Sequence, residues 1–120
     1  MQTLDEINAQ EHAIRDKAWR YQQVLGEVER CKRAIERLTP TVAAFGVTLD
    51  VLTQIEQLAA QLPAEVLGTM SHIARDQIRG TCLVAKTGQQ KRRERDQRDL
   101  TNATTQLPEF EAQLRAIEQE

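Results

Sequence analysis

Residues 4–35, LDEINAQEHAIRDKAWRYQQVLGEVERCKRAI, decide the fold, because apolar side chains recur along them at alternating spacings of three and four. This spacing places the apolar residues on one stripe of a helix, in the heptad pattern of coiled coils. The residues that form this stripe, here called the predicted seam, are Leu4, Ile7, Ile14, Ala18, Tyr21, Leu25, Val28 and Ile35.

The first helix is predicted to span residues 3–38. Thr3 and Glu6 have the spacing of a capping box, in which each side chain accepts a hydrogen bond from the other residue's backbone N–H. Pro40 disfavours the helical conformation for the residue before it, so we expect the helix to end near Leu38. A helix of this span is about 50 Å long, so it either projects or pairs along most of its length.

Two charged residues, Glu11 and Lys32, interrupt the predicted seam at the heptad position a. In a parallel homodimer each would face its own copy, which disfavours parallel self-pairing. An antiparallel self-pair instead places the small Ala18 opposite the large Tyr21. The other alternative is that the helix pairs with a neighbouring helix of its own chain.

Further helices are predicted along the rest of the chain. Their expected ranges are 48–62, 64–86, 87–105 as a polar basic helix or linker, and 107–119. The apolar residues before Gly46 suggest a bend or a short helical turn between the first two helices. Pro63 fits the first turn of a helix, and Pro108 either kinks the last helix or begins it. Gly80 and Gly88 weaken a continuous helix without excluding one.

The composition supports an all-helical fold. The chain has 120 residues, enough for one domain, and a formal net charge of −2. Gln, Glu, Arg, Leu and Ala dominate, and aromatic residues are few, which is typical of helices and coiled coils. We therefore expect one all-α domain over residues 1–120. It would be a helical bundle or antiparallel coiled coil with one long N-terminal helix and two to three shorter helices.

Residues suited to catalysis or metal binding are few. His12 with Asp16, and His72 with Asp76, are each four residues apart, so each pair shares a helix face. His12 lies beside the predicted seam and points to solvent. Ser71 directly precedes His72, and adjacent helical residues do not face each other. We predict no catalytic residue, no metal and no cofactor, and a protein that is not an enzyme.

The two cysteines, Cys31 and Cys82, lie far apart without a CxxC spacing, so we expect two buried, reduced thiols. The N-terminus lacks a basic region followed by an apolar run, so no signal peptide is expected. Asp50 and Glu56 interrupt the most apolar stretch, 41–62, which argues against a membrane span. These features predict a cytoplasmic protein that does not contact a membrane.

A run of cations lies within residues 86–98. Its candidate phosphate-binding residues are Lys91, Arg92, Arg93, Arg95 and Arg98. On a helix Lys91, Arg95 and Arg98 share one sector, which acidic residues flank, whereas Arg93 lies on the far side. No aromatic residue is interleaved for base stacking. The run is interpreted first as a solvated helix face, second as a nucleic-acid contact, and third as a site of charge pairing between subunits.

The sequence favours a non-catalytic protein–protein interaction module, acting as an adaptor, regulator or inhibitor. It would oligomerise, with a homodimer as one outcome, or dock on a larger protein. The surfaces for this are the predicted seam and the apolar residues between Leu49 and Met70. The alternative is a nucleic-acid-associated subunit or accessory factor that contacts phosphates through the basic segment 86–98.

Overall fold

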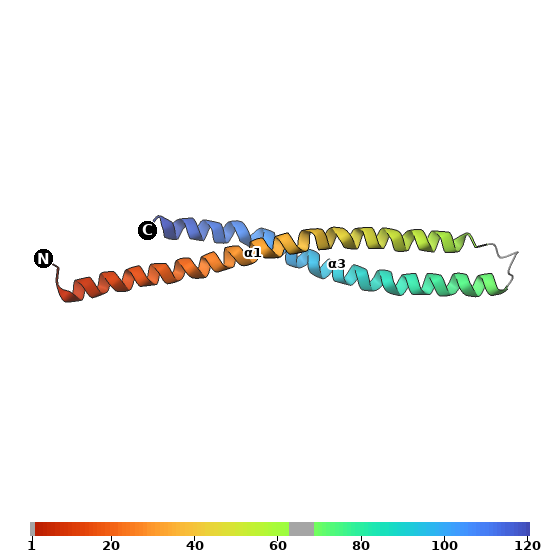
Figure 1. Ribbon diagram of the computed structural model, residues 1–120, viewed down its shortest axis with the longest axis horizontal. Coiled ribbons are helices and arrows are strands. Elements are labelled where there is room, and N and C mark those ends of the chain that lie inside the picture. The colour runs from red at the N-terminus through yellow and green to blue at the C-terminus, as the bar shows by residue number, and fades with distance from the viewer. Residues whose placement is uncertain (1, 63–68) are drawn as a thin grey trace. The chain divides into compact units, whose positions relative to one another are not determined.

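The computed structural model describes residues 2–62 and 69–120, with side chains up to Leu62 and from Ile73 onward. Two helices account for nearly all of these residues (Figure 1). Helix α1 spans Leu4–Ala60 and helix α3 spans Thr69–Glu118. No strand occurs in the described residues, so the all-α class is confirmed for them.

The capping box predicted at the start of α1 is confirmed. The backbone N–H of Thr3 donates to the Glu6 carboxylate at 3.2 Å, and the backbone N–H of Glu6 donates to the Thr3 hydroxyl at 3.2 Å. Two of the N–H groups that a helix start leaves without an intrahelical partner are satisfied in this way. Helix α1 therefore begins at Leu4, close to the predicted position.

The predicted end of the first helix is wrong. Helix α1 continues through Pro40 and Gly46 to Ala60, so neither a bend at 42–46 nor a separate helix 48–62 exists. Proline inside a helix removes one hydrogen bond and costs about 3 kcal/mol. Here Pro40 is exposed, as is Glu36, the residue whose carbonyl loses the bond.

Packing offsets the cost of this proline. Leu38 and Val42, on either side of Pro40, are 2% and 9% exposed. Ending the helix at Leu38 would remove Val42 from its helical position. Because burying an aliphatic side chain contributes roughly 1.5–3 kcal/mol, the burial of Val42 is comparable with the cost of one proline.

Helix α3 joins segments that the sequence divides. The predicted separate elements 87–105 and 107–119 belong to one helix, which also passes through Gly80, Gly88 and Pro108. Pro108 is exposed, so its missing hydrogen bond lies on the solvent side. The start of the helix predicted at 64–86, together with Pro63, lies outside the described residues.

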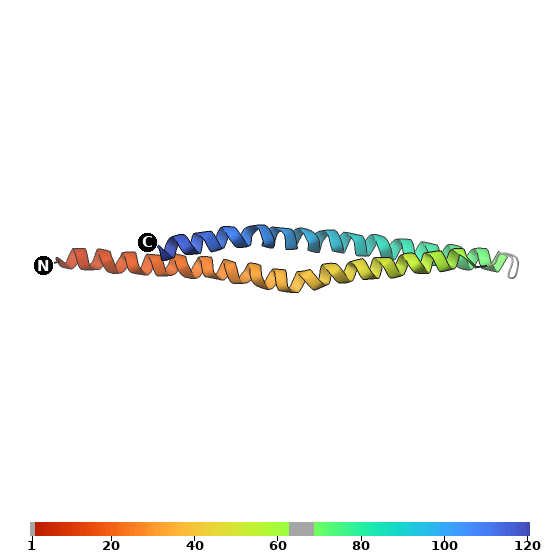
Figure 2. The same cartoon turned by 90° about the horizontal axis from the view of Figure 1, so that it is seen from above.

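The chain divides into two compact units. Unit 1 comprises Met1–Arg37 and Leu100–Glu120, and unit 2 comprises Leu38–Asp99. Within each unit a stretch of α1 lies antiparallel to a stretch of α3, which can be followed by colour in Figures 1 and 2. Unit 1 pairs the orange part of α1 with the blue end of α3, and unit 2 pairs the yellow and green part of α1 with cyan turns of α3.

The core of unit 1 uses only part of the predicted seam and adds Cys31 to it. Val28 and Cys31 are 3% and 0% exposed and face α3, whose Ala103 and Ile117 are also buried. Among the predicted a positions, Ala18 is exposed and Leu25 is half-buried. Two further residues of the predicted seam, Tyr21 and Ile35, are half-buried. They lie on the same covered side of α1 as Val28.

The core of unit 2 continues with the same heptad spacing. Its buried residues are Leu38, Val42, Ala59 and Cys82. With Cys31 in unit 1, the prediction of two buried, free thiols is confirmed. This core also contains polar side chains, because Lys86 Nζ bonds to Glu56 Oε2 at 3.3 Å across the two helices.

Candidate interaction surfaces

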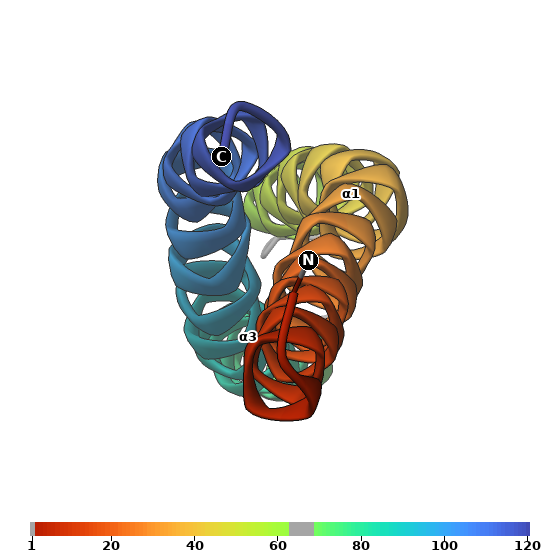
Figure 3. The same ribbon diagram turned by 90° about the vertical axis from the view of Figure 1, so that its left-hand side faces the viewer.

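The first turns of α1 have no helix packed against them in unit 1. Every side chain from Leu4 to Asp16 is exposed, and we call this segment the N-terminal overhang. Figures 1 and 2 show that it extends past the end of α3, and in Figure 3 it is the part of unit 1 nearest to the viewer. At 1.5 Å per residue the overhang is roughly 20 Å long.

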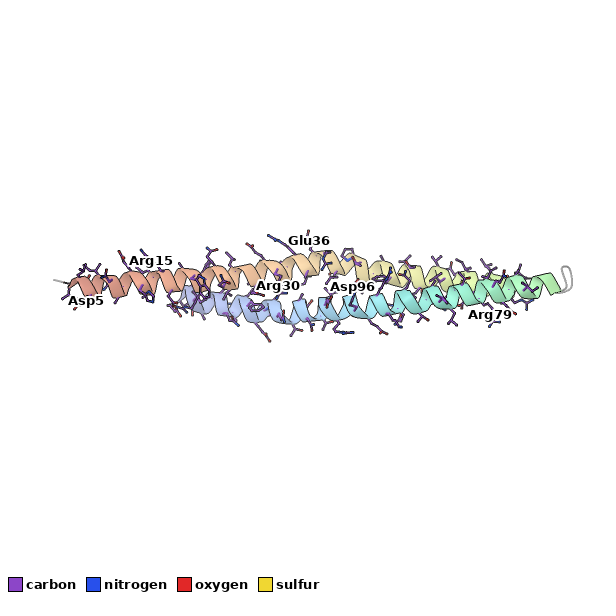
Figure 4. All side chains as sticks on the ribbon, turned by 90° about the horizontal axis from the view of Figure 1, so that it is seen from below. Asp5, Arg15, Arg30, Glu36, Arg79 and Asp96 are labelled. Carbon is purple, nitrogen blue, oxygen red and sulfur yellow. The ribbon has the colours of Figure 1, made fainter. Side chains whose placement is uncertain are left out.

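The overhang exposes apolar as well as charged side chains. Leu4 is 72% exposed, Ile14 68% and Ile7 41%. Figure 4 labels Asp5 and Arg15 on this same segment, where no second ribbon accompanies α1. An isolated helix of this length is only marginally stable in water, so a partner that covers its apolar side would also stabilise the helix itself.

A polar cluster marks the point where the pairing of α1 with α3 begins. The guanidinium of Arg20 donates to both carboxylate oxygens of Glu120, with Nη1–Oε1 at 2.9 Å and Nη2–Oε2 at 2.7 Å. Lys17 Nζ donates to the backbone carbonyl of Glu120 at 3.3 Å, and the hydroxyl of Tyr21 donates to Glu118 at 3.2 Å. These contacts, which we call the terminal cluster, fix the end of α3 beside this turn of α1.

Hydrogen bonding in the terminal cluster shifts three pKa values. The bonds to Glu120 raise the pKa of Arg20 above its ordinary value, and the same bonds lower the pKa of Glu120. The bond to Glu118 raises the pKa of the Tyr21 hydroxyl above its ordinary value. The side chains of Arg20 and Glu120 are 38% and 46% exposed, so water screens the pair and the cluster orients the helix ends more than it stabilises the fold.

A hollow opens on α1 next to the terminal cluster. It has a volume of about 470 Å³. Its lining consists of Ile14, Lys17, Ala18, Tyr21, Gln22 and Glu118. Three of these, Ile14, Ala18 and Tyr21, belong to the predicted seam, so this part of the seam borders a space that another side chain can enter.

The structure therefore divides the predicted seam into two parts. The residues left exposed are Leu4, Ile7, Ile14 and Ala18. The residues half-buried or buried on the side towards α3 are Tyr21, Leu25, Val28 and Ile35. The intrachain pairing that the sequence left as an alternative is present in the second part, and the first part remains uncovered within the described residues.

Unit 2 has an outward apolar face that overlaps the surface predicted between Leu49 and Met70. Val47, Val51, Ile55 and Leu58 lie at spacings of four, four and three along α1 and are all exposed. Beside Ile55 is a hollow of about 330 Å³ between the two helices, lined largely by aliphatic side chains. Val51, Ile55 and Leu58 lie within the predicted range, whereas Val47 lies outside it.

Helix α1 also satisfies a simple test for a membrane span. An 18-residue stretch is long and apolar enough to cross a bilayer by length and composition, and 11% of it is buried. A single helix of this kind is weak evidence for a span, because the apolar helix of a protein outside the membrane passes the same test.

The basic segment is helical and lies in α3. Four of its candidate phosphate-binding residues are exposed, namely Lys91, Arg92, Arg95 and Arg98. Arg93 is half-buried, and its guanidinium lies 3.9 Å from the Cβ position that a larger residue would add at Gly46. Arg95 is 3.5 Å from the carboxylate of Asp96, so one cation of the exposed group has an acidic neighbour.

The remaining candidate residues form no constellation in the described part of the chain. His12 is exposed on the overhang, whereas the side chains of Ser71 and His72 lie outside the described residues. Among the described residues, no group of three or more His, Cys, Asp or Glu side chains is placed to hold a metal ion. The terminal cluster was not predicted, because its two halves lie about a hundred residues apart in sequence and no local pattern connects them.

These features define an antiparallel helical pair with uncovered apolar surfaces. No family model, no curated protein and no solved structure matches the chain.

Proposed function

We propose that this protein is a non-catalytic helical interaction module that associates with a protein partner through the N-terminal overhang. The observation that carries the proposal is the exposure of Leu4, Ile7 and Ile14 on a helix segment against which the chain packs nothing in its described part. The partner is either a second copy or a larger protein, for which this chain would serve as an adaptor, regulator or inhibitor.

The physical argument concerns the cost of leaving the overhang uncovered. A short helix in water gains little from its own hydrogen bonds and depends on packing of its apolar stripe. Leu4, Ile7 and Ile14 share one side of the helix, so a single partner helix can cover all three. Covering such side chains contributes roughly 1.5–3 kcal/mol for each one that becomes fully buried.

The proposal is tested by replacing two residues of the stripe, Ile7→Gln and Ile14→Gln, in the full chain. The wild-type chain should retain a bound protein, either a differently tagged second copy or a protein of the native host, that the double variant loses. The matched control is Val47→Gln with Leu58→Gln, which changes two apolar side chains on unit 2 that are each 64% exposed. Identical binding by all three proteins would refute the proposal.

A second candidate function is contact with nucleic-acid phosphates through Lys91, Arg92, Arg95 and Arg98, with Arg93 as a further candidate. The exposure of the first four cations on one helix supports it. Phosphate contacts are strongest at low salt, so binding of a duplex or a single strand should appear there and weaken steeply as salt is added. Reversing the charge at Arg95 and Arg98 should abolish it, and an absence of binding at low salt would rule this function out.

We further propose that the protein acts in the cytoplasm, away from the membrane and without a cofactor. Two observations support this location: Cys31 and Cys82 are free, buried thiols, and Asp50 and Glu56 lie within the apolar part of α1. Fractionation of the native host tests it, because the protein should remain with the soluble fraction after membranes are sedimented.

A further inference from the structure

We propose that the overhang pairs with residues 4–21 of a second copy of this chain, which lies antiparallel to it. This inference rests on the proposed interaction function and names the partner. The side chains of α1 that a second copy can reach include Leu4 to Asp16 and Ala18, which are exposed in the described structure.

The apolar stripe of α1 continues beyond the intrachain interface. In unit 1, α3 ends beside Lys17, Arg20 and Tyr21, whereas α1 extends further as the overhang. The overhang carries Ile7 and Ile14, which lie two heptads and one heptad before Tyr21. The helix surface that pairs with α3 in unit 1 thus leads directly into one that is uncovered.

The end of α3 leaves room for another helix. Lys17 and Arg20 are half-buried and hold Glu120, so α3 occupies their side of α1. Ala18 lies on another side of α1 and is exposed. With Ile14 it lines the hollow of about 470 Å³, which opens to solvent. A second helix can therefore lie along the Ile14 and Ala18 side without displacing α3.

One antiparallel alignment fits both the length of the overhang and the position of the hollow. It places Ile7 opposite Ala18 of the second copy and Leu4 opposite Tyr21 of the second copy. Positions a then meet positions d, as in antiparallel helix packing. The symmetry axis passes between residues 12 and 13, so each Leu4 reaches the hollow of the other copy and the assembly closes as a dimer.

The charges favour the antiparallel arrangement over the parallel one. A parallel pair would place Glu11 against Glu11 of the other copy. In the antiparallel alignment Glu11 faces Ile14 of the second copy. Arg15 of the second copy is the next residue along, so it lies close to Glu11. Within the chain, Arg15 and Glu11 are 4.0 Å apart with both side chains largely exposed, so this weak pair can be exchanged for a contact between copies.

The first test measures the mass of the full chain in solution by sedimentation over a range of concentrations. The wild-type chain should pass from monomer to dimer, and Ile7→Gln with Ile14→Gln should weaken the dimer at least about tenfold. Val47→Gln with Leu58→Gln should leave it unchanged. Glu11→Leu should strengthen it, because the substitution removes a charge from the centre of the contact.

The second test determines the orientation of the two copies. A chain with Ile7→Cys is mixed with a chain with Ala18→Cys under oxidising conditions, while the buried native thiols remain protected. The proposed alignment predicts a disulfide between the two different variants. A disulfide that forms faster within the Ile7→Cys sample alone would show parallel pairing and overturn the alignment.

The outcomes separate this inference from the proposed function. A wild-type chain that is monomeric at all concentrations overturns the self-pairing, as does a dimer that only the Val47 and Leu58 substitutions dissolve. If the monomeric chain still binds a host protein that Ile7→Gln with Ile14→Gln releases, the interaction function stands and only the identity of the partner is wrong. Helix content measured by circular dichroism confirms that each variant is folded.

Discussion

The side chains of Arg20 and Glu120 form a bidentate ion pair although exactly one hundred positions of sequence separate them, with N–O distances of 2.9 and 2.7 Å. This pair and the neighbouring bond from Tyr21 to Glu118 hold α3 in one register along α1. In the described structure the turns of α1 before Lys17 lie outside this pairing, and all their side chains from Leu4 to Asp16 are exposed.

The first prediction concerns acid. The pKa of Glu120 is lowered in the folded chain by its hydrogen bonds to Arg20, so the pair stabilises the fold above the ordinary carboxylate pKa of 4.5. This contribution should be lost as the pH falls through the lowered pKa. The melting temperatures of the wild-type chain and of Glu120→Gln should differ slightly at pH 7 and converge in acid. A difference that grows on acidification would contradict the prediction.

A second prediction uses the single tyrosine of the chain. The hydrogen bond to Glu118 raises the pKa of Tyr21 above its ordinary value of 10.0. Ultraviolet absorbance titration should therefore show one transition above pH 10, and the bond's contribution to stability should be present below pH 10 and lost above the raised pKa. Glu118→Gln should move the transition back towards pH 10. An unchanged transition would mean that the bond does not form in solution.

The polar pair in the core of unit 2 provides a third prediction. Lys86 and Glu56 are about 30% exposed and lie 3.3 Å apart at their charged atoms. Their coupling energy, measured by a double-mutant cycle with alanine at each position, should be about 0.5–1 kcal/mol. Replacing both residues by leucine should leave the stability unchanged or raise it, because an apolar pair avoids the desolvation cost. A large loss in that variant would show that the ion pair is essential to the fold.

Pro40 allows a direct test of helix continuity. Because α1 passes through this exposed proline, Pro40→Ala restores a backbone hydrogen bond to Glu36 and improves the helix propensity. The free energy of unfolding in urea should rise by about 1–3 kcal/mol. Thr39→Ala is the matched control and should have a much smaller effect. A destabilised Pro40→Ala chain would show that the proline belongs to a break in the helix.

The two thiols can report on the two units separately. Cys31 is 0% exposed in unit 1 and Cys82 is 4% exposed in unit 2. Both should react with a thiol reagent at least about tenfold more slowly in the native chain than in the unfolded chain, because reaction requires local opening. Val28→Ala should accelerate the labelling of Cys31 more than that of Cys82. Rapid labelling of either native thiol would contradict its burial.

The sequence predicts the class of the fold because heptad spacing is a local property. Each short window of residues 4–35 shows the apolar stripe, and the capping box at Thr3 and Glu6 involves residues three positions apart. The end predicted near Leu38 was wrong because a local rule assigns a proline its cost but does not count the packing of Val42, beyond the proline, that offsets it. The exposed part of the predicted seam remains a prediction as an interaction site.

The sequence by itself determined that this chain is helical and that Tyr21, Val28 and Ile35 lie on a covered side of α1. Only the tertiary structure decided that Cys31, rather than Ala18, completes that side, and that the helix before Lys17 is left without α3. The physical reason is that two apolar stripes of α1 share Tyr21, Val28 and Ile35. One stripe includes Ala18 and the other Cys31, so the spacing of apolar residues does not distinguish them. The choice depends on a second helix, and where that helix lies is set by contacts between residues far apart in the chain.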